Sequence, residues 1–223
     1  MISKVSYCFV MGMLFTLHSY GQHTQIIKVG DYIYTDGTTS SNKLDSKECI
    51  GIIIANETNE NDKVHGFHHG VVMALNDTGN KKRYSWGPYG EYNDKKEYRY
   101  EKADSLSEAF EAFEAVKSMS VPYFHNSGWM LPSPEHWEAM LRNIGLSDKL
   151  DWVHRLERLY SIMNFTHEEF NSDIGYWLST SSSGRSAKYG YSGGVVSGDY
   201  VEPYKGFMGD KSKKKKVRAV LVF

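Results

Sequence analysis

Residues 128–137, which read GWMLPSPEHW, constrain the fold more than any other part of the chain. The segment predicts a short buried strand, a bend stiffened by Pro132, and the start of a helix. Ser133 is expected at the N-cap, where its oxygen can accept from an N–H of the first turn, and Pro134 suits the first helical position. This helix should run to about residue 144. These features define a fold and carry no catalytic chemistry.

Three tryptophans belong to this fold-defining set. Trp129 and Trp137 bracket the bend, and Trp177 lies in a short apolar run further along the chain. Each has a large apolar surface, and burial of this surface against other side chains stabilises a fold. We therefore assign all three to the core and none to a ligand site.

The composition limits the classes of partner. The chain has 223 residues, enough for one domain with a sizeable core, and a formal net charge of -1. This balance argues against nucleic acid as a partner. The run at residues 211–216, KSKKKK, is the strongest basic feature. Since lysines commonly keep hairpin turns solvated, the sequence predicts an exposed turn there.

Residues 1–21 resemble a cleavable export signal. A lysine precedes an apolar stretch at residues 7–17, and Ser19 and Gly21 supply small residues where signal peptidase cleaves. The mature chain would be a single domain at residues 22–223, exported to the periplasm, the outer-membrane surface or the medium. The apolar stretch is too short to span a bilayer, and no other segment is long enough.

The cysteines fit this interpretation without adding a crosslink. Cys8 would leave with the signal, so Cys49 would stand alone in the mature chain, which excludes an intramolecular disulfide. The residues before Cys8 also lack the small-residue context of a lipoprotein signal. A packed core must therefore hold the domain together.

The order of expected elements predicts an α+β fold. Apolar and alternating runs indicate strands, and three-to-four-residue apolar spacing indicates helices, the first with a Ser105–Glu108 capping box. Since an apolar strand lies near each end of the mature chain, the two are expected to pair. The expected strands are residues 26–34, 49–55, 71–75, 174–180, 188–196 and 217–223, and the expected helices are 105–119, 134–144 and 148–163.

A histidine cluster is the main candidate for metal chemistry. His65, His68 and His69 could place two nitrogens on one side of a turn and hold zinc or copper. Since no Cys, Asp or Glu follows at ligand spacing, we predict no metal there and keep a metal-dependent hydrolase as the lesser alternative. Loop aspartates could bind calcium, but no calcium-loop motif supports it, and the sequence also lacks a nucleophile elbow and a phosphate-binding loop. No cofactor is predicted.

An ordered set of short motifs resembles a family. Residues 28–37 (KVGDYIYTDG) are similar to the opening VGDYLYSDGT of a group of exported Bacteroidetes proteins. Further matches follow in order across the mature chain. They are residues 50–52 to IGIV, 69–75 to HGLVVAL, 128–133 to GWYLPS, 176–180 to YWSST and 217–223 to VRPVRAF.

The resemblance implies a C-type-lectin-like fold, as in the Fibrobacter succinogenes major paralogous and DUF1566 (Lcl C-terminal) domains. It implies a small twisted, mostly antiparallel sheet with paired N- and C-terminal strands, two to three flanking helices, and a ligand site in a long loop region. His136 stands where the family has an acidic residue, and Leu178 where it has a serine. The motifs of calcium-dependent sugar binding are missing, because Glu202-Pro203 is followed by Tyr204 and Trp177 by Leu178.

The expected function is therefore ligand binding or adhesion without catalysis. Tyrosine combines stacking area with a polar tip, so the Tyr- and Gly-rich loops are the expected contact face for a glycan or protein. The predicted anchors are Tyr189, Tyr191, Tyr200 and Tyr204. The alternative is a structural or assembly component of a surface or fimbrial structure, which would capture partners through an exposed sheet edge.

Overall fold

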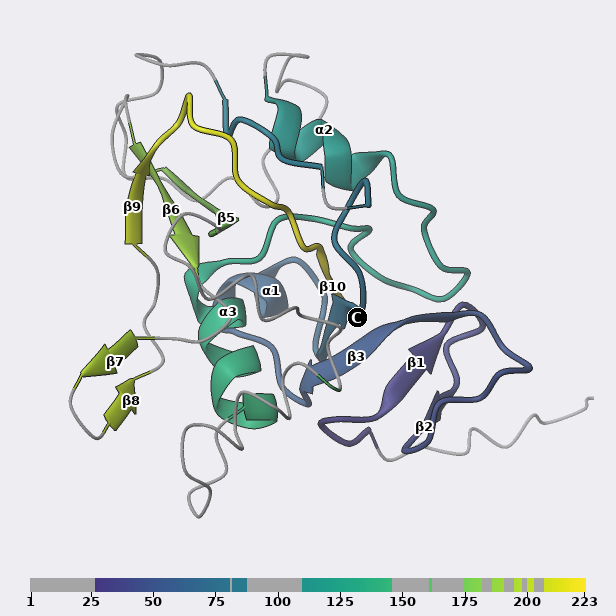
Figure 1. Ribbon diagram of the computed structural model, residues 1–223. Helices are drawn as coiled ribbons and strands as arrows, with labels where there is room; N and C mark the ends of the chain where they lie inside the picture. Colours follow the sequence, from purple (N-terminus) through teal and green to yellow (C-terminus); the bar gives the residue numbers. More distant parts are fainter. Residues whose placement is uncertain are drawn as a thin grey trace, which may run out of the picture.

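The computed structural model describes residues 27–80, 82–87, 110–145, 161, 175–181, 186–190, 195–197, 200–202 and 207–223. The expected leader and nearly all of the helix expected at 148–163 lie outside these residues. The described part is an α+β arrangement of short helices and mostly antiparallel strands, as the sequence predicts (Figure 1).

The elements fall into three groups along the chain. The first contains β1 (Tyr32–Tyr34), β2 (Thr39–Ser40), β3 (Cys49–Ala55), α1 (Glu60–Val64) and β4 (Val71–Ala74). The second contains α2 (Glu111–Lys117), α3 (Pro134–Met140) and the π-helical turn η2 (Leu141–Gly145). The third contains β5 (Tyr176–Ser181), β6 (Ser186–Gly190), β7 (Val195–Ser197), β8 (Tyr200–Glu202), β9 (Phe207–Asp210) and β10 (Val220–Val222).

The central sheet has the strand order β10-β4-β3-β1-β2, and its neighbouring strands are antiparallel. The predicted pairing of the first and last strands is therefore wrong, because β3 and β4 separate β1 from β10. The physical reason lies in β4, whose four residues are all buried. A buried strand needs a hydrogen-bonded partner on both sides, and the apolar β3 and β10 occupy these places.

The strand expected at residues 26–34 is reduced to β1. Gly30 adopts a φ of +89°, a left-handed conformation that favours glycine, and so turns the chain before Asp31. The Gly30 N–H donates to the carbonyl of Ile53, and the Ile53 N–H donates to the carbonyl of Asp31. These two bonds align β1 on β3 without extending the strand backwards.

Both faces of the central sheet are covered. Ile53, Val72 and Leu221 pack with α2 in one apolar cluster, whereas their chain neighbours pack with α3 in the other. This alternation follows from the two-residue period of a strand. It also explains the continuous apolar sequences of β3, β4 and β10, because a sheet buried on both faces needs apolar residues at every position.

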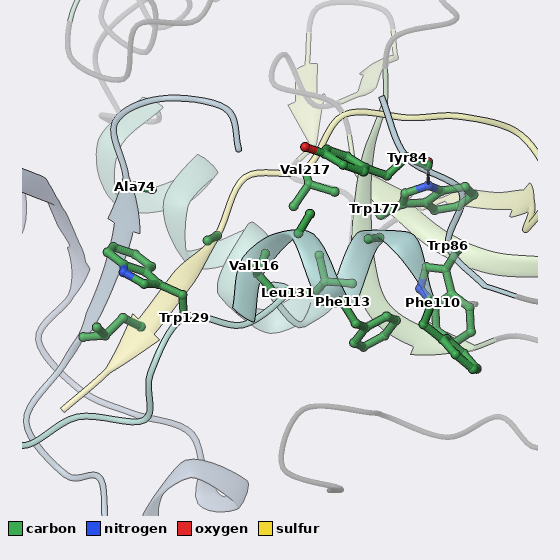
Figure 2. Packing of buried hydrophobic residues seen from close by; sticks show 14 of the residues in the cluster. Ala74, Tyr84, Trp86, Phe110, Phe113, Val116, Trp129, Leu131, Trp177 and Val217 are labelled. Carbon is green, nitrogen blue, oxygen red and sulfur yellow. Dashed lines mark hydrogen bonds between the residues drawn. The ribbon is translucent and has the colours of Figure 1, made fainter. Parts of the chain in front are cut away.

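Aromatic rings fill the α2 side of the sheet (Figure 2). Trp86 meets Phe110 and Phe113 edge-on, with ring centres 5.8 and 5.2 Å apart. The predicted helix at 105–119 is wrong at Phe110, which has φ −97° and ψ 67° and precedes a helix that begins at Glu111. Residues 105–109, including the expected capping box, lie outside the described residues. Burial of the Phe110 ring against Trp86 fixes this residue at the N-cap.

Helix α3 begins where the sequence predicts. Ser133 is its N-cap, with the Oγ accepting from the His136 N–H at 3.1 Å, and Pro134 is its first residue. The last turn is η2, which ends at Gly145. The expected strand before the bend is reduced to a bridge between Met130 and Val220.

A second sheet has the order β5-β6-β9, and β7 and β8 form a separate hairpin. The segment expected as one or two strands at 188–196 contains β6 and β7. The second sheet adjoins the segment that leads into β10, since Tyr176 of β5 forms a parallel bridge with Lys216.

Candidate functional site

The basic run at residues 211–216 differs from the exposed turn that the sequence predicts. Lys211 is 0% exposed, Lys215 9% and Lys216 5%, whereas Lys213 and Lys214 are exposed. The prediction of a solvated turn is thus wrong for three of its five lysines. A buried ammonium group needs compensating contacts, and aromatic rings supply some of them.

Each buried lysine faces an aromatic ring from a different part of the chain. The Nζ of Lys211 lies 4.5 Å from the centre of the Trp86 ring, that of Lys215 5.6 Å from Trp177, and that of Lys216 5.8 Å from Tyr176. An ammonium group within about 6 Å of a ring face is attracted by the ring's negative face. The buried lysines of the run therefore pack against a set of three aromatic rings.

Asp77 provides the negative charge beside Lys216, the last of these buried lysines. Its Oδ2 lies 3.2 Å from the Nζ of Lys216, and its Oδ1 accepts from the Nε of Arg218 at 3.0 Å and also from the Nη2. The Nη1 of Arg218 donates to the carbonyl of Leu75 at 2.8 Å. The side chains of Asp77, Lys216 and Arg218 are at most 7% exposed. This carboxylate thus joins two buried cations.

The backbone of residues 211–223, here called the C-terminal segment, contacts several distant parts of the chain. Lys215 exchanges two hydrogen bonds with Tyr84, and the Lys216 carbonyl accepts from Trp177 of β5. Further on, Val220 exchanges two with Met130 and pairs with β4. One segment therefore connects the second sheet, the bend before α3 and the central sheet.

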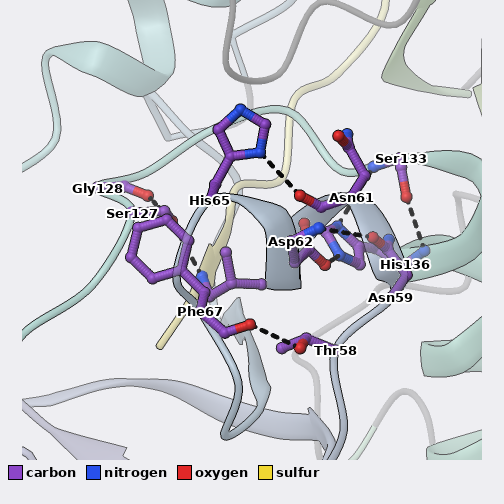
Figure 3. Close-up of polar contacts among 11 residues, drawn as sticks. Thr58, Asn59, Asn61, Asp62, His65, Phe67, Ser127, Gly128, Ser133 and His136 are labelled. Atoms are coloured by element: carbon purple, nitrogen blue, oxygen red, sulfur yellow. Dashed lines mark hydrogen bonds and ion pairs between the residues drawn. The ribbon is translucent and has the colours of Figure 1, made fainter.

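A second polar cluster joins α1 to α3 (Figure 3). The Nε2 of His136 lies 3.0 Å from the Oδ2 of Asp62, and the two side chains are 3% and 0% exposed. The backbone N–H of Ser133 points at the Nδ1 of His136 at 3.5 Å. Because Nδ1 must accept from that N–H, the proton lies on Nε2, which donates to Asp62.

This Ser–His–Asp set is a structural cluster. The Oγ of Ser133 faces the His136 backbone rather than its ring, and Ser133, His136 and Asp62 are all buried. A nucleophile needs a base within reach of its own oxygen and access for a substrate. The geometry therefore provides a helix cap and a tie between two helices.

The three candidate metal ligands are all exposed, and they make separate contacts. The Nδ1 of His65 lies 2.8 Å from the carbonyl of Asn61, and the backbone N–H of His69 donates to the carbonyl of Phe223. His68 is also exposed. Within the described ranges, no three His, Cys, Asp or Glu side chains converge to hold a metal.

The expected tyrosine anchors can be placed only by their backbone. Tyr189 lies on β6, paired with Trp177 and Phe207, and Tyr200 begins β8. Tyr191 and Tyr204 lie outside the described residues. Trp129, Trp137 and Trp177 are 7%, 0% and 0% exposed, and Pro132 is buried beside Ser133.

Hydrogen bonds shift the pKa of several surface carboxyls. The Lys47 ammonium, with the hydroxyl and N–H of Thr38, holds the pKa of Asp36 well below its usual value. The Ser85 N–H lowers the pKa of Glu111, and the Ser212 hydroxyl and N–H lower that of Asp210. Each bond favours the charged form of its carboxyl.

Sequence reasoning missed the residues that hold these clusters: Asp62, Asp77, His136 and Arg218. The available signal was Arg218, since a charged residue inside the apolar run VRAVLVF must find a buried partner. Nothing in the local sequence identifies that partner as Asp77, 141 residues earlier.

No protein-family model and no curated protein matches this chain. A crystal structure of a fimbrial protein from Bacteroides ovatus ATCC 8483 is similar, with a TM-score of 0.56 and 18% sequence identity. The similarity covers 88% of this chain and 49% of that one, so this chain spans about half the length of that protein. At this identity the match shows a shared fold. In the described part of the chain, no helix has the length and hydrophobicity to cross a membrane.

Proposed function

We propose that this chain is a non-enzymatic component of a cell-surface structure of the fimbrial kind. The observation that carries the proposal is the fold shared with a fimbrial protein over 88% of the chain. This agrees better with the assembly alternative drawn from the sequence than with sugar recognition through tyrosine loops. The partners would then be other protein subunits at the cell surface.

The architecture suits a mechanical role. The last strand is held on one side by β4 and on the other by Met130, and the cation–aromatic contacts fix the run before it. A segment bonded to several distant parts of the chain resists being pulled out, because many contacts must break together. Such a domain can carry load between subunits.

The proposal also includes export of the chain and a relation to a known family. Residues 1–21 would direct export, and residues 22–223 would be the assembled domain. The likeness of its motifs to the Fibrobacter succinogenes major paralogous and DUF1566 domains would reflect a common surface location. The sheet order gives no support for the lectin-like part, because the terminal strands do not pair.

Fractionation of surface filaments tests the role. Filaments would be sheared from the bacterium that produces the chain, purified, and probed with an antibody against it. We expect the chain in the filament fraction, in a fixed ratio to the other subunits. A strain lacking the gene provides the control and should yield fewer, shorter or altered filaments. Recovery of the chain only from the cell interior, with unchanged filaments in the deletion strain, would contradict the proposal.

A further inference from the structure

A pocket of about 440 Å³ lies between α2 and the segment at residues 82–84. Three of its lining residues, Glu111, Glu114 and Ala115, come from α2, and a fourth, Ser118, is the C-cap of this helix. Their spacing of three, four and seven places them on one face of the helix. The opposite face, with Phe113 and Val116, is buried in the core. Lys82 and Tyr84 complete the lining.

The Tyr84 hydroxyl is the unusual group in this pocket. Tyr84 is only 7% exposed, yet its hydroxyl makes no hydrogen bond within the part of the chain described here. Figure 2 shows this hydroxyl pointing away from Trp86 and Phe110. It lies against Gly79, where an added Cβ would come within 2.0 Å of the oxygen. A buried polar group without a partner costs stability, so such groups call for an explanation.

The other polar groups of the pocket carry charges of both signs, and some can form further hydrogen bonds. Glu111 uses its Oε2 to accept from the Ser85 N–H at 3.0 Å, and Glu114 uses its Oε1 to bind Lys117 at 3.0 Å. The Ser85 side chain also bonds the Glu111 carboxylate, and the Nζ of Lys214 lies 3.8 Å from its Oε2. In the described ranges, the Oε2 of Glu114 accepts no hydrogen bond from the protein. The Nζ of Lys82 lies 5.1 Å from the centre of the Tyr84 ring.

We propose that this pocket binds a neutral ligand rich in hydroxyl groups, namely a sugar unit. The two carboxylates disfavour an anion. Lys117 and Lys214, which pair with these carboxylates, and Lys82 in the lining disfavour a cation. Hydroxyl groups can donate to the free oxygen of Glu114 and accept from Lys82, while the Tyr84 hydroxyl donates or accepts as required. The volume falls in the range of about 300–1,000 Å³ typical of small-molecule sites.

This site is independent of the assembly role proposed above and uses none of the four tyrosines predicted as anchors. A subunit can assemble without binding sugar, and a sugar can bind to an isolated subunit. The filament fractionation and the binding test described next can therefore fail separately.

Titration of the purified chain with methyl glycosides of glucose, galactose, mannose and N-acetylglucosamine tests the proposal by NMR. We expect at least one to shift the amide signals of residues 82–85 and 111–118 in a saturable way. Tyr84→Phe removes only the hydroxyl and should weaken binding about three- to tenfold. Its midpoint of denaturation should stay the same or rise, because the hydroxyl has no partner in the fold.

Two further variants complete the test. Glu114→Gln keeps the side-chain shape and should also weaken binding, whereas Tyr123→Phe changes a 94% exposed tyrosine outside the pocket and should leave it unchanged. Absence of saturable shifts with all four glycosides overturns the proposal. So does binding that Tyr84→Phe and Glu114→Gln leave intact, or binding of a charged probe, methylammonium or acetate, in place of the glycosides.

Discussion

The ammonium group of Lys211 lies 4.5 Å from the centre of the Trp86 ring, and both residues are 0% exposed. A lysine in a run of five is thus part of the core, while Lys213, two residues on, is exposed. The two positions share a sequence context and differ in burial.

Substitution of these two lysines should therefore have unequal effects. Lys211→Ala removes a buried side chain and its cation–π contact, so we expect the free energy of unfolding to fall by about 1–3 kcal/mol. Lys213→Ala should change it by less than about 0.5 kcal/mol. Urea denaturation measures both, and equal effects would show that the run is solvated.

Asp77 should be among the most sensitive charged residues. Asp77→Ala leaves the Lys216 and Arg218 side chains buried without this carboxylate, and loss of one partner from a buried pair costs about 3–5 kcal/mol. Asp45→Ala, at an exposed loop carboxylate, is the matched control and should be neutral. A similar small change in both variants would argue against the buried network.

The tie between α1 and α3 should be visible in spectra and in stability. Nitrogen-15 shifts of His136 should show a proton on Nε2 and an accepting Nδ1. His136→Ala removes the hydrogen bond to buried Asp62 and should cost about 2–3 kcal/mol of unfolding free energy. His68→Ala serves as the exposed control. Detection of the proton on Nδ1 in place of Nε2 would refute the assigned bond to Asp62.

Glu111 should contribute to acid sensitivity. Its pKa is lowered in the folded chain, mainly by the Ser85 N–H, so its contribution is present above its unfolded value of 4.5. That contribution is lost as the pH falls below 4.5 through the lowered folded pKa. In Glu111→Gln the loss of stability between pH 5 and pH 2 should be smaller than in the parent chain. Denaturation midpoints across this range measure it, and an unchanged acid slope would rule out the bond to Ser85.

A strand or helix could be predicted from the sequence wherever a local pattern of residues determines it. The apolar run of β3 and the Ser133–Pro134 helix start depend on local chemistry and lie where expected. The pairing of β10 depends on β4, a buried strand that needs a neighbour on each side. The paired residues Leu221 and Val72 lie 149 positions apart in the chain. The burial of Lys211 depends likewise on Trp86. Local patterns cannot encode these long-range pairings, so both were predicted wrongly.

Immunogold electron microscopy of the producing bacterium tests the central claim most directly. An antibody raised against the whole purified, folded chain would be applied to intact cells, with the deletion strain as the control. We predict gold particles along filaments that extend from the cell surface, and none on the deletion strain. Filaments that carry no label, on cells whose lysates contain the chain, would contradict a role in surface assembly.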